Sequence, residues 1–212
     1  TEHACSYWLP NLENIQAIII GGPGATKDYV VRNEYFHHEI AKKIAKTHFD
    51  VGYSNESGVR ELVDNAGALM GEIELDAERQ IMNRFLAELI KAQPRATYGE
   101  MMIRKALEQG AVDTLLISES MRKNSVEIEC GGCGHTWTAS LSRTEELPEC
   151  PACEVSNDSH KELSNISLID VLSEMSAKSN SEIAFISIDT EEGAQLAHGF
   201  GGLAAILRYP MM

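Results

Sequence analysis

The spacing of apolar residues predicts strands and helices in alternation from the start of the chain. Residues 15–20 form an apolar run that is followed directly by Gly-Gly-Pro-Gly, which is typical of a buried strand leaving its sheet. Helical spacing follows from about Glu34 to Lys46, and a second apolar stripe covers Val59–Met70. Asn55 is placed to cap the second of these helices. The first third of the chain is therefore expected to be a small α/β domain.

A second α/β domain is expected from about residue 74 to residue 212, with the boundary near residue 73. Its first helix begins near Asp76 and ends before Pro94. The Thr97–Glu100 segment has the form of a capping box, and Gly110 is placed to end the helix that this segment opens. The later elements are a strand at 115–117, a helix at 167–178, a strand at 183–188, a helix opened by Thr190 and a strand at 203–209. This order is that of an α/β fold, and an insertion at about 124–165 interrupts it.

The composition narrows the class of partner. The chain has 212 residues, of which 43% are hydrophobic, so it can bury a core. Lys and Arg number 18 and Asp and Glu number 32, which gives a net charge of −14. Because attraction to nucleic acid or to anionic lipid depends on Lys and Arg, no DNA partner and no membrane partner is expected. No apolar run approaches 18 residues, and the N-terminus does not read as a secretory signal.

Four cysteines in two Cys-x-x-Cys pairs give the strongest chemical signal in the chain. The pairs are Cys130 with Cys133 and Cys150 with Cys153. Two such pairs joined by a short hairpin can bring four thiolates together as a structural Zn²⁺ site, one per chain, in a reducing compartment such as the cytoplasm. The alternatives are two disulfides or four unrelated thiols. His135 lies inside the knuckle but is read as a bystander, because four sulfurs already complete the tetrahedral shell.

Charge limits what the cysteine segment can touch. Residues 124–165 hold eight acids and two bases, and four thiolates with one Zn²⁺ add two further negative charges. Such a lobe repels phosphate. The insertion is therefore expected to serve folding or a contact with another protein, rather than nucleic-acid binding.

Two motifs imitate functional signatures but lack the required residues. The segment Gly21–Lys27 resembles a P-loop, yet Thr26 and Asp28 stand where a P-loop needs Gly and then Ser or Thr. We expect a turn at a strand end there. The run from His38 imitates a zinc-protease helix, but Lys42 replaces the second His. No catalytic residue is assigned, and the chain is not expected to be an enzyme.

Several segments together resemble the class-1 peptide chain release factors of archaea and eukaryotes, in their archaeal form. The matching stretches are Ile18–Lys27, Ala106–Val112 with the strand after it, and Gly199–Tyr209. The C-terminal stretch, Gly-Phe-Gly-Gly-Leu-Ala-Ala-Ile-Leu-Arg-Tyr, is the most specific. Cysteine pairs inserted in the last domain are also similar to the archaeal members, where they imply a zinc-bearing minidomain.

The resemblance implies a factor of three domains. The first reads stop codons, the middle one carries a Gly-Gly-Gln loop that promotes hydrolysis of peptidyl-tRNA, and the last binds an elongation-factor-like GTPase and the ribosome-recycling ATPase. Residues 1–73 resemble the second half of the middle domain. Residues 74–212 resemble the complete last domain, which is similar to kink-turn-binding ribosomal proteins in its α/β/α sandwich. Because Gly-Gly-Gln does not occur, the chain is expected to be a C-terminal fragment that docks partners on the ribosome during translation termination.

The resemblance also implies a partner-facing surface. Its candidate residues are Gly199, Phe200, Gly201, Gly202 and Arg208. Glycine required for a tight turn is the competing interpretation. Phe200 lies between glycines, so it is either an exposed aromatic anchor or part of the core.

Three other functions stay open at this point. A Pelota-like ribosome-rescue factor shares the fold, but the cysteine insertion and the Gly-Phe-Gly-Gly stretch argue against it. A zinc-ribbon RNA-binding module would need a basic face, which the chain barely supplies. A metal hydrolase would need an open coordination position, which four cysteines do not leave.

Overall fold

The computed structural model describes residues 2–33, 35–153 and 159–211. The chain divides into two compact units, Thr1–Ala77 and Glu78–Met212. The elements of the first unit are α1 (Glu2–Trp8), the 3-10 helix η1 (Leu9–Asn14), β1 (Ile18–Gly22), α2 (Thr26–Arg32), α3 (His38–Ala41), β2 (Ile44–Asp50) and the first part of α4 (Glu56–Leu89).

The first unit is built on two parallel strands. β1 pairs with β2, with Ile18 opposite Ile44 and Gly22 opposite Asp50. The helix expected over residues 34–46 is wrong, because α3 has four residues and Ile44 already begins β2. Glu34 lies outside the described residues. An apolar stripe of this length does not distinguish a helix from a short turn followed by a strand. Pairing with β1 makes the segment from Ile44 a strand.

The helix α4 is one continuous element of 34 residues. Separate helices over 59–70 and from Asp76 were expected, but the sequence holds no proline between the two stripes, and a glycine there costs a helix only about 1 kcal/mol. Asn55 caps it as predicted, since its Oδ1 accepts hydrogen bonds from the amides of Ser57 (3.1 Å) and Gly58 (3.3 Å). Within the described part of the chain, neither α4 nor any other helix is long and apolar enough to cross a membrane.

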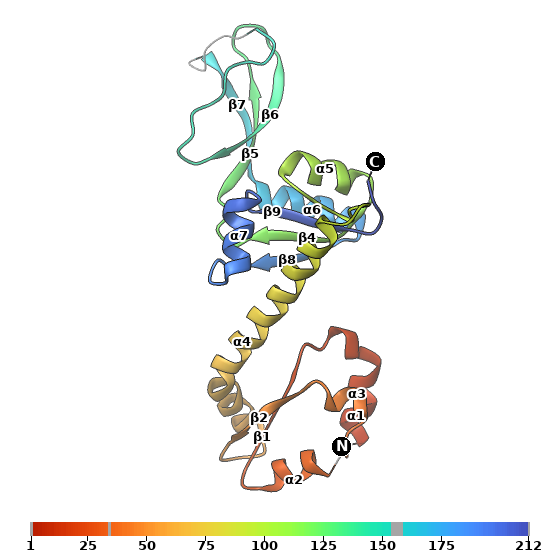
Figure 1. Cartoon of the computed structure of the whole chain (residues 1–212). Helices are drawn as coiled ribbons and strands as arrows, with labels where there is room; N and C mark the ends of the chain where they lie inside the picture. Colours follow the sequence, from red (N-terminus) through yellow and green to blue (C-terminus); the bar gives the residue numbers. More distant parts are fainter. Residues whose placement is uncertain (1, 34, 154–158, 212) are drawn as a thin grey trace. The chain divides into compact units, whose positions relative to one another are not determined.

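A four-stranded sheet organises the second unit, in the order β3-β9-β4-β8. Its strands β9, β4 and β8 are labelled in Figure 1. Its elements are the end of α4, β3 (Ala96–Tyr98), α5 (Glu100–Glu108), β4 (Val112–Ser118), α6 (Leu168–Ser179), β8 (Glu182–Ile186), α7 (Glu191–Gly199) and β9 (Leu203–Leu207). β4 runs parallel to β8 and antiparallel to β9. Apart from the helix expected to begin near Asp76, the predicted strands and helices of this domain outside the insertion are present, with small differences at their ends.

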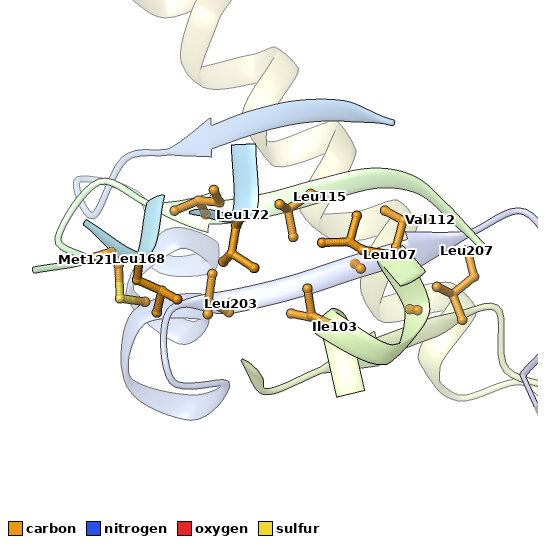
Figure 2. Packing of buried hydrophobic residues seen from close by; sticks show 12 residues of the cluster. Ile103, Leu107, Val112, Leu115, Met121, Leu168, Leu172, Leu203 and Leu207 are labelled. Carbon is orange, nitrogen blue, oxygen red and sulfur yellow. The ribbon is translucent and has the colours of Figure 1, made fainter. Parts of the chain in front are cut away.

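Both faces of this sheet are covered by helices. On one face, α5 and α6 contribute Ile103, Leu168 and Leu172 to a cluster with β4 and β9 (Figure 2). On the other face, the end of α4 and α7 contribute Met82, Phe85 and Leu196 to a second cluster. Residues of β9 alternate between these clusters, which is why the strand reads as a continuous apolar run.

Turn residues set the ends of the helices. Gly110 adopts φ +64° after α5 and its amide bonds the Leu107 carbonyl at 3.0 Å, as expected of a helix end. The expected capping box is wrong: Thr97 lies in β3, and Gly99 with φ +83° precedes α5 without a side-chain cap. Thr190 opens α7 as predicted, because its Oγ1 accepts the Gly193 amide at 3.0 Å.

The insertion forms its own antiparallel sheet of order β6-β5-β7. Its strands are β5 (Lys123–Glu129), β6 (Thr136–Ser142) and β7 (Lys161–Ser167). β5 is the central strand, with Glu129 opposite both Thr136 of β6 and Lys161 of β7. The knuckle between β5 and β6 therefore lies at one end of the sheet.

A glycine near the start of α7 should be sensitive to substitution. A Cβ at Gly193 would lie 1.8 Å from the Ser187 carbonyl oxygen, so Gly193→Ala should lower the free energy of unfolding by about 2 kcal/mol or more. Gly199→Ala is the matched control in the same helix, because its nearest neighbour is the Gln195 side chain at 3.6 Å. Its effect should stay within about 1 kcal/mol. Urea denaturation measures both, and equal effects would contradict the close contact.

Candidate metal centre and partner surface

The four predicted cysteines meet at one end of the inserted sheet. The Sγ atoms of Cys130 and Cys153 lie 3.6 Å apart, and those of Cys133 and Cys150 lie 3.7 Å apart. All four Sγ atoms lie within 4.8 Å of one another. Cys130 and Cys150 are buried, and none of the four forms a disulfide in this structure.

The sulfur positions fit a tetrahedral metal. A tetrahedron with bonds of about 2.3 Å from Zn²⁺ to sulfur has edges of about 3.8 Å, close to the two short separations. The four thiols could therefore hold one metal ion with little movement. His135 is exposed and does not belong to the cluster of potential ligands found among the described residues.

Each cysteine knuckle is shaped by its backbone. The Gly132 amide donates to Cys130 Sγ at 3.3 Å, and the Ala152 amide donates to Cys150 Sγ at 3.4 Å. Hydrogen bonding from the Cys133 amide, helped by that of Gly132, lowers the pKa of Cys130 to about 6. At neutral pH this sulfur is therefore mostly thiolate, which is the form that binds metal.

Glycine is needed at two places in the first knuckle. Gly134 adopts φ +72° and its amide bonds the Cys130 carbonyl at 2.9 Å. A Cβ at Gly131 would lie 2.1 Å from the Ser159 carbonyl oxygen. The segment leading into β7 therefore rests directly against the knuckle.

Aromatic rings pack beside the knuckle. Trp137 of β6 stacks on His135 with ring centroids 6.0 Å apart and meets His160 edge to face at 5.2 Å. Trp137 therefore contacts two histidine rings, one next to the first knuckle in sequence and one directly before β7.

A polar network that sequence reasoning missed ties the insertion to α5. Glu100 Oε1 accepts hydrogen bonds from Ser140 Oγ at 2.6 Å and from Arg104 Nε at 2.8 Å. A terminal nitrogen of Arg104 also reaches Ser125 Oγ at 3.4 Å. The spacing of Glu100 and Arg104 signals a helical ion pair, but nothing in the sequence indicates a partner 40 residues away.

The two imitation motifs have structural roles. Lys27 donates to the Gly24 carbonyl at 2.7 Å and to Asp50 Oδ1 at 2.5 Å, which holds the turn after β1 to the end of β2. Lys42 and His38 both contact Glu39 on the surface of α3.

The glycine-rich stretch forms the turn between α7 and β9. Gly201 and Gly202 adopt φ +69° and +79°, and the Gly202 amide bonds the Leu196 carbonyl at 2.9 Å. Phe200 is half-buried, with its ring centroid 5.2 Å from that of Phe85 and 5.1 Å from that of Tyr98. Aromatic neighbours therefore shield it in part.

Arg208 lies at the other end of β9 from the glycines. Its guanidinium donates to the carbonyls of Gly110 (3.2 Å) and Asn180 (2.5 Å). The strand between them spans about 17 Å at the usual rise per residue. The structure therefore does not bring Arg208 together with Gly199–Gly202.

Family models match nearly the whole chain. The model described as eRF1 domain 3 matches residues 75–211, and the model described as eRF1 domain 2 matches residues 1–72. The first match alone covers more than half of the chain.

Two curated archaeal relatives carry the same name. The chain is 42% identical to peptide chain release factor subunit 1 of Thermococcus onnurineus over 98% of its own length, and 39% identical to that of Archaeoglobus fulgidus over the same share. These matches cover 51% and 50% of the two relatives. The chain thus spans about half the length of the curated relatives it matches.

Solved structures agree with this relationship. The C-terminal domain of a peptide chain release factor from Methanosarcina mazei is 37% identical, with a TM-score of 0.60 over 74% of this chain and 98% of that one. A model of ribosome-bound archaeal Pelota and ABCE1 has a TM-score of 0.57 at 17% identity, over 96% of this chain and 46% of that one, which shows a shared fold. With two family models and relatives about 40% identical along almost all of its length, the chain belongs to the family of peptide chain release factor subunit 1, the eRF1 family.

Proposed function

We propose that this chain is the part of a translation-termination factor that docks its partners. The identity of 42% with a release factor over 98% of the chain carries this proposal. In the whole protein, other parts would read the stop codon and supply the Gly-Gly-Gln loop that promotes release of the nascent peptide. We assign no catalytic residue to the chain, because it contains no Gly-Gly-Gln.

The two units would correspond to different domains of that factor. Residues 1–73 would be the second half of the middle domain, and residues 74–212 the complete last domain. The matches to eRF1 domains 2 and 3 support this division. A sheet covered by helices on both faces supports the comparison of the last domain with the α/β/α sandwich of kink-turn-binding ribosomal proteins.

The last domain would bind a translational GTPase and, on the ribosome in the cytoplasm, the recycling ATPase. The shared fold with a Pelota that is described together with the ribosome and ABCE1 supports the second partner. We place the GTPase at the turn of Gly199–Gly202 with the half-buried Phe200. Arg208 is the weaker member of this surface, because its guanidinium is engaged by two backbone carbonyls at the far end of β9.

A Pelota-like rescue factor is the second candidate function. The TM-score of 0.57 to the Pelota model favours it. The sequence identity with that protein is only 17%, against 42% with the release factor, so termination remains the better proposal.

We further propose one structural Zn²⁺ on Cys130, Cys133, Cys150 and Cys153. The sulfur separations and the tetrahedral fit support zinc rather than a redox-active or open site. The ion would link the two cysteine knuckles to each other at the end of the three-stranded sheet β6-β5-β7.

The zinc proposal predicts a local effect of ligand loss. Cys150→Ser should abolish stoichiometric zinc and increase hydrogen exchange across residues ~124–153 and 159–165. The four-stranded sheet should stay protected, because its two apolar clusters do not involve the cysteines. Metal analysis and hydrogen exchange measure both effects, with Cys5→Ser as the control that keeps the metal. A parent protein without zinc, when purified without chelator, would refute the site.

Substitution of Phe200 tests the partner surface. Phe200→Ala should lower the free energy of unfolding by about 2 kcal/mol, since two aromatic contacts are lost from a half-buried ring. At a temperature where the variant stays folded, its affinity for the GTPase should fall about tenfold. Phe185→Ala, which removes an exposed ring from the edge strand β8, is the control. Unchanged GTPase binding by folded Phe200→Ala would remove this turn from the interface.

The docking role also predicts what the chain cannot do alone. Added to ribosomes stalled at a stop codon, the isolated chain should release no peptide above background, because the Gly-Gly-Gln loop that acts at the ester is not in it. Single-turnover peptide release gives the measurement. Stop-codon-dependent hydrolysis by this chain would overturn the proposed division of roles.

A further inference from the structure

His160 is a polar side chain that is shielded from solvent but forms no hydrogen bond with any described residue. Both ring nitrogens are closed off from solvent, and neither has a hydrogen-bond partner among the residues that the structure describes. Leaving a buried donor or acceptor unpaired costs about 1–3 kcal/mol, so such a group in a native protein needs an explanation.

The strand register places His160 beside the first cysteine. Glu129 of β5 lies opposite Lys161 of β7, the last pair of this ladder. Continuing the same register by one residue past the strand ends puts Cys130 opposite His160. Residues opposite each other in a ladder project to the same face, with Cβ atoms about 4.5–5.5 Å apart.

Two independent contacts agree with this placement. Trp137 lies opposite Ile128, two positions from Cys130 and so on the same face of β5, and its ring meets that of His160. The Ser159 carbonyl rests against Gly131 inside the first knuckle. The ring contact of His160 and the backbone contact of its neighbour Ser159 therefore both place His160 next to the first knuckle.

A metal ion bound by four cysteine thiolates needs hydrogen-bond donors around its sulfur atoms. Four thiolates and one Zn²⁺ leave a net charge of −2, and a buried charge is costly unless it is hydrogen-bonded. Gly132 and Ala152 each supply one backbone N–H to a buried sulfur. An imidazole N–H adjacent to Cys130 would add a side-chain donor to the same cluster.

We propose that, in the metal-loaded protein, a ring N–H of His160 donates a hydrogen bond to the thiolate of Cys130. His160 is then a positioning residue that stabilises the metal site without binding the ion. This inference rests on the proposed zinc site. It also explains why the two shielded ring nitrogens of His160 have no other partner among the described residues.

Measurements of zinc affinity can distinguish a hydrogen bond from His160 from the packing of its ring. His160→Phe keeps a ring against Trp137 but removes the N–H, and zinc affinity measured by chelator competition should fall about tenfold or more. His160→Gln keeps an N–H donor and should recover part of the loss. His135 is the exposed ring that stacks on Trp137, and His135→Phe is the control. It should change the zinc affinity less than twofold.

A spectroscopic measurement on the parent protein keeps the test independent of folding in the variants. With ¹¹³Cd in the site, a through-bond coupling between the metal and the His160 ring proton should be visible by NMR. A parent that binds zinc but shows no such coupling, together with His160→Phe that binds zinc as tightly, would overturn this inference and leave the zinc site standing. A parent that binds neither metal would overturn both.

Discussion

The second unit depends on the burial of β9 on both faces. Every residue from Leu203 to Leu207 is at most 3% exposed, and the strand lies between β3 and β4. Its alternate side chains complete two separate apolar clusters, so helices must cover both faces of the sheet. The turn before it needs glycines with positive φ, and Arg208 after it ties the strand end to two neighbouring backbone carbonyls.

The sequence predicted best the elements whose residues act locally. Asn55, Gly110 and Thr190 mark helix ends by their own backbone and side-chain chemistry, and all three do so in the structure. Prediction from the sequence failed where pairing between residues far apart in the chain determines the secondary structure. Ile44 follows a helical stripe by spacing, yet it pairs with Ile18, 26 positions earlier in the chain, and becomes a strand. Likewise, Thr97 has the form of a helix cap but joins β9 through β3.

The same contrast holds within the cysteine site. Cys130, Cys133, Cys150 and Cys153 could be found by spacing, because paired thiols on tight turns are themselves the signal. Neither His160 nor the link from Glu100 to Ser140 could be found in this way. The first depends on the register of β5 against β7. The second joins residues that are separated along the chain by α5, β4, β5 and the first knuckle.

The two ends of the insertion lie next to each other, between β4 and α6. Asn124 lies opposite Ser167 as an adjacent ladder pair, so their Cα atoms are about 5 Å apart, a gap that a two-residue turn can bridge. A change in the length of the insertion therefore need not move β4 or α6. The same junction offers protein engineers a point at which a foreign hairpin can be grafted onto the fold.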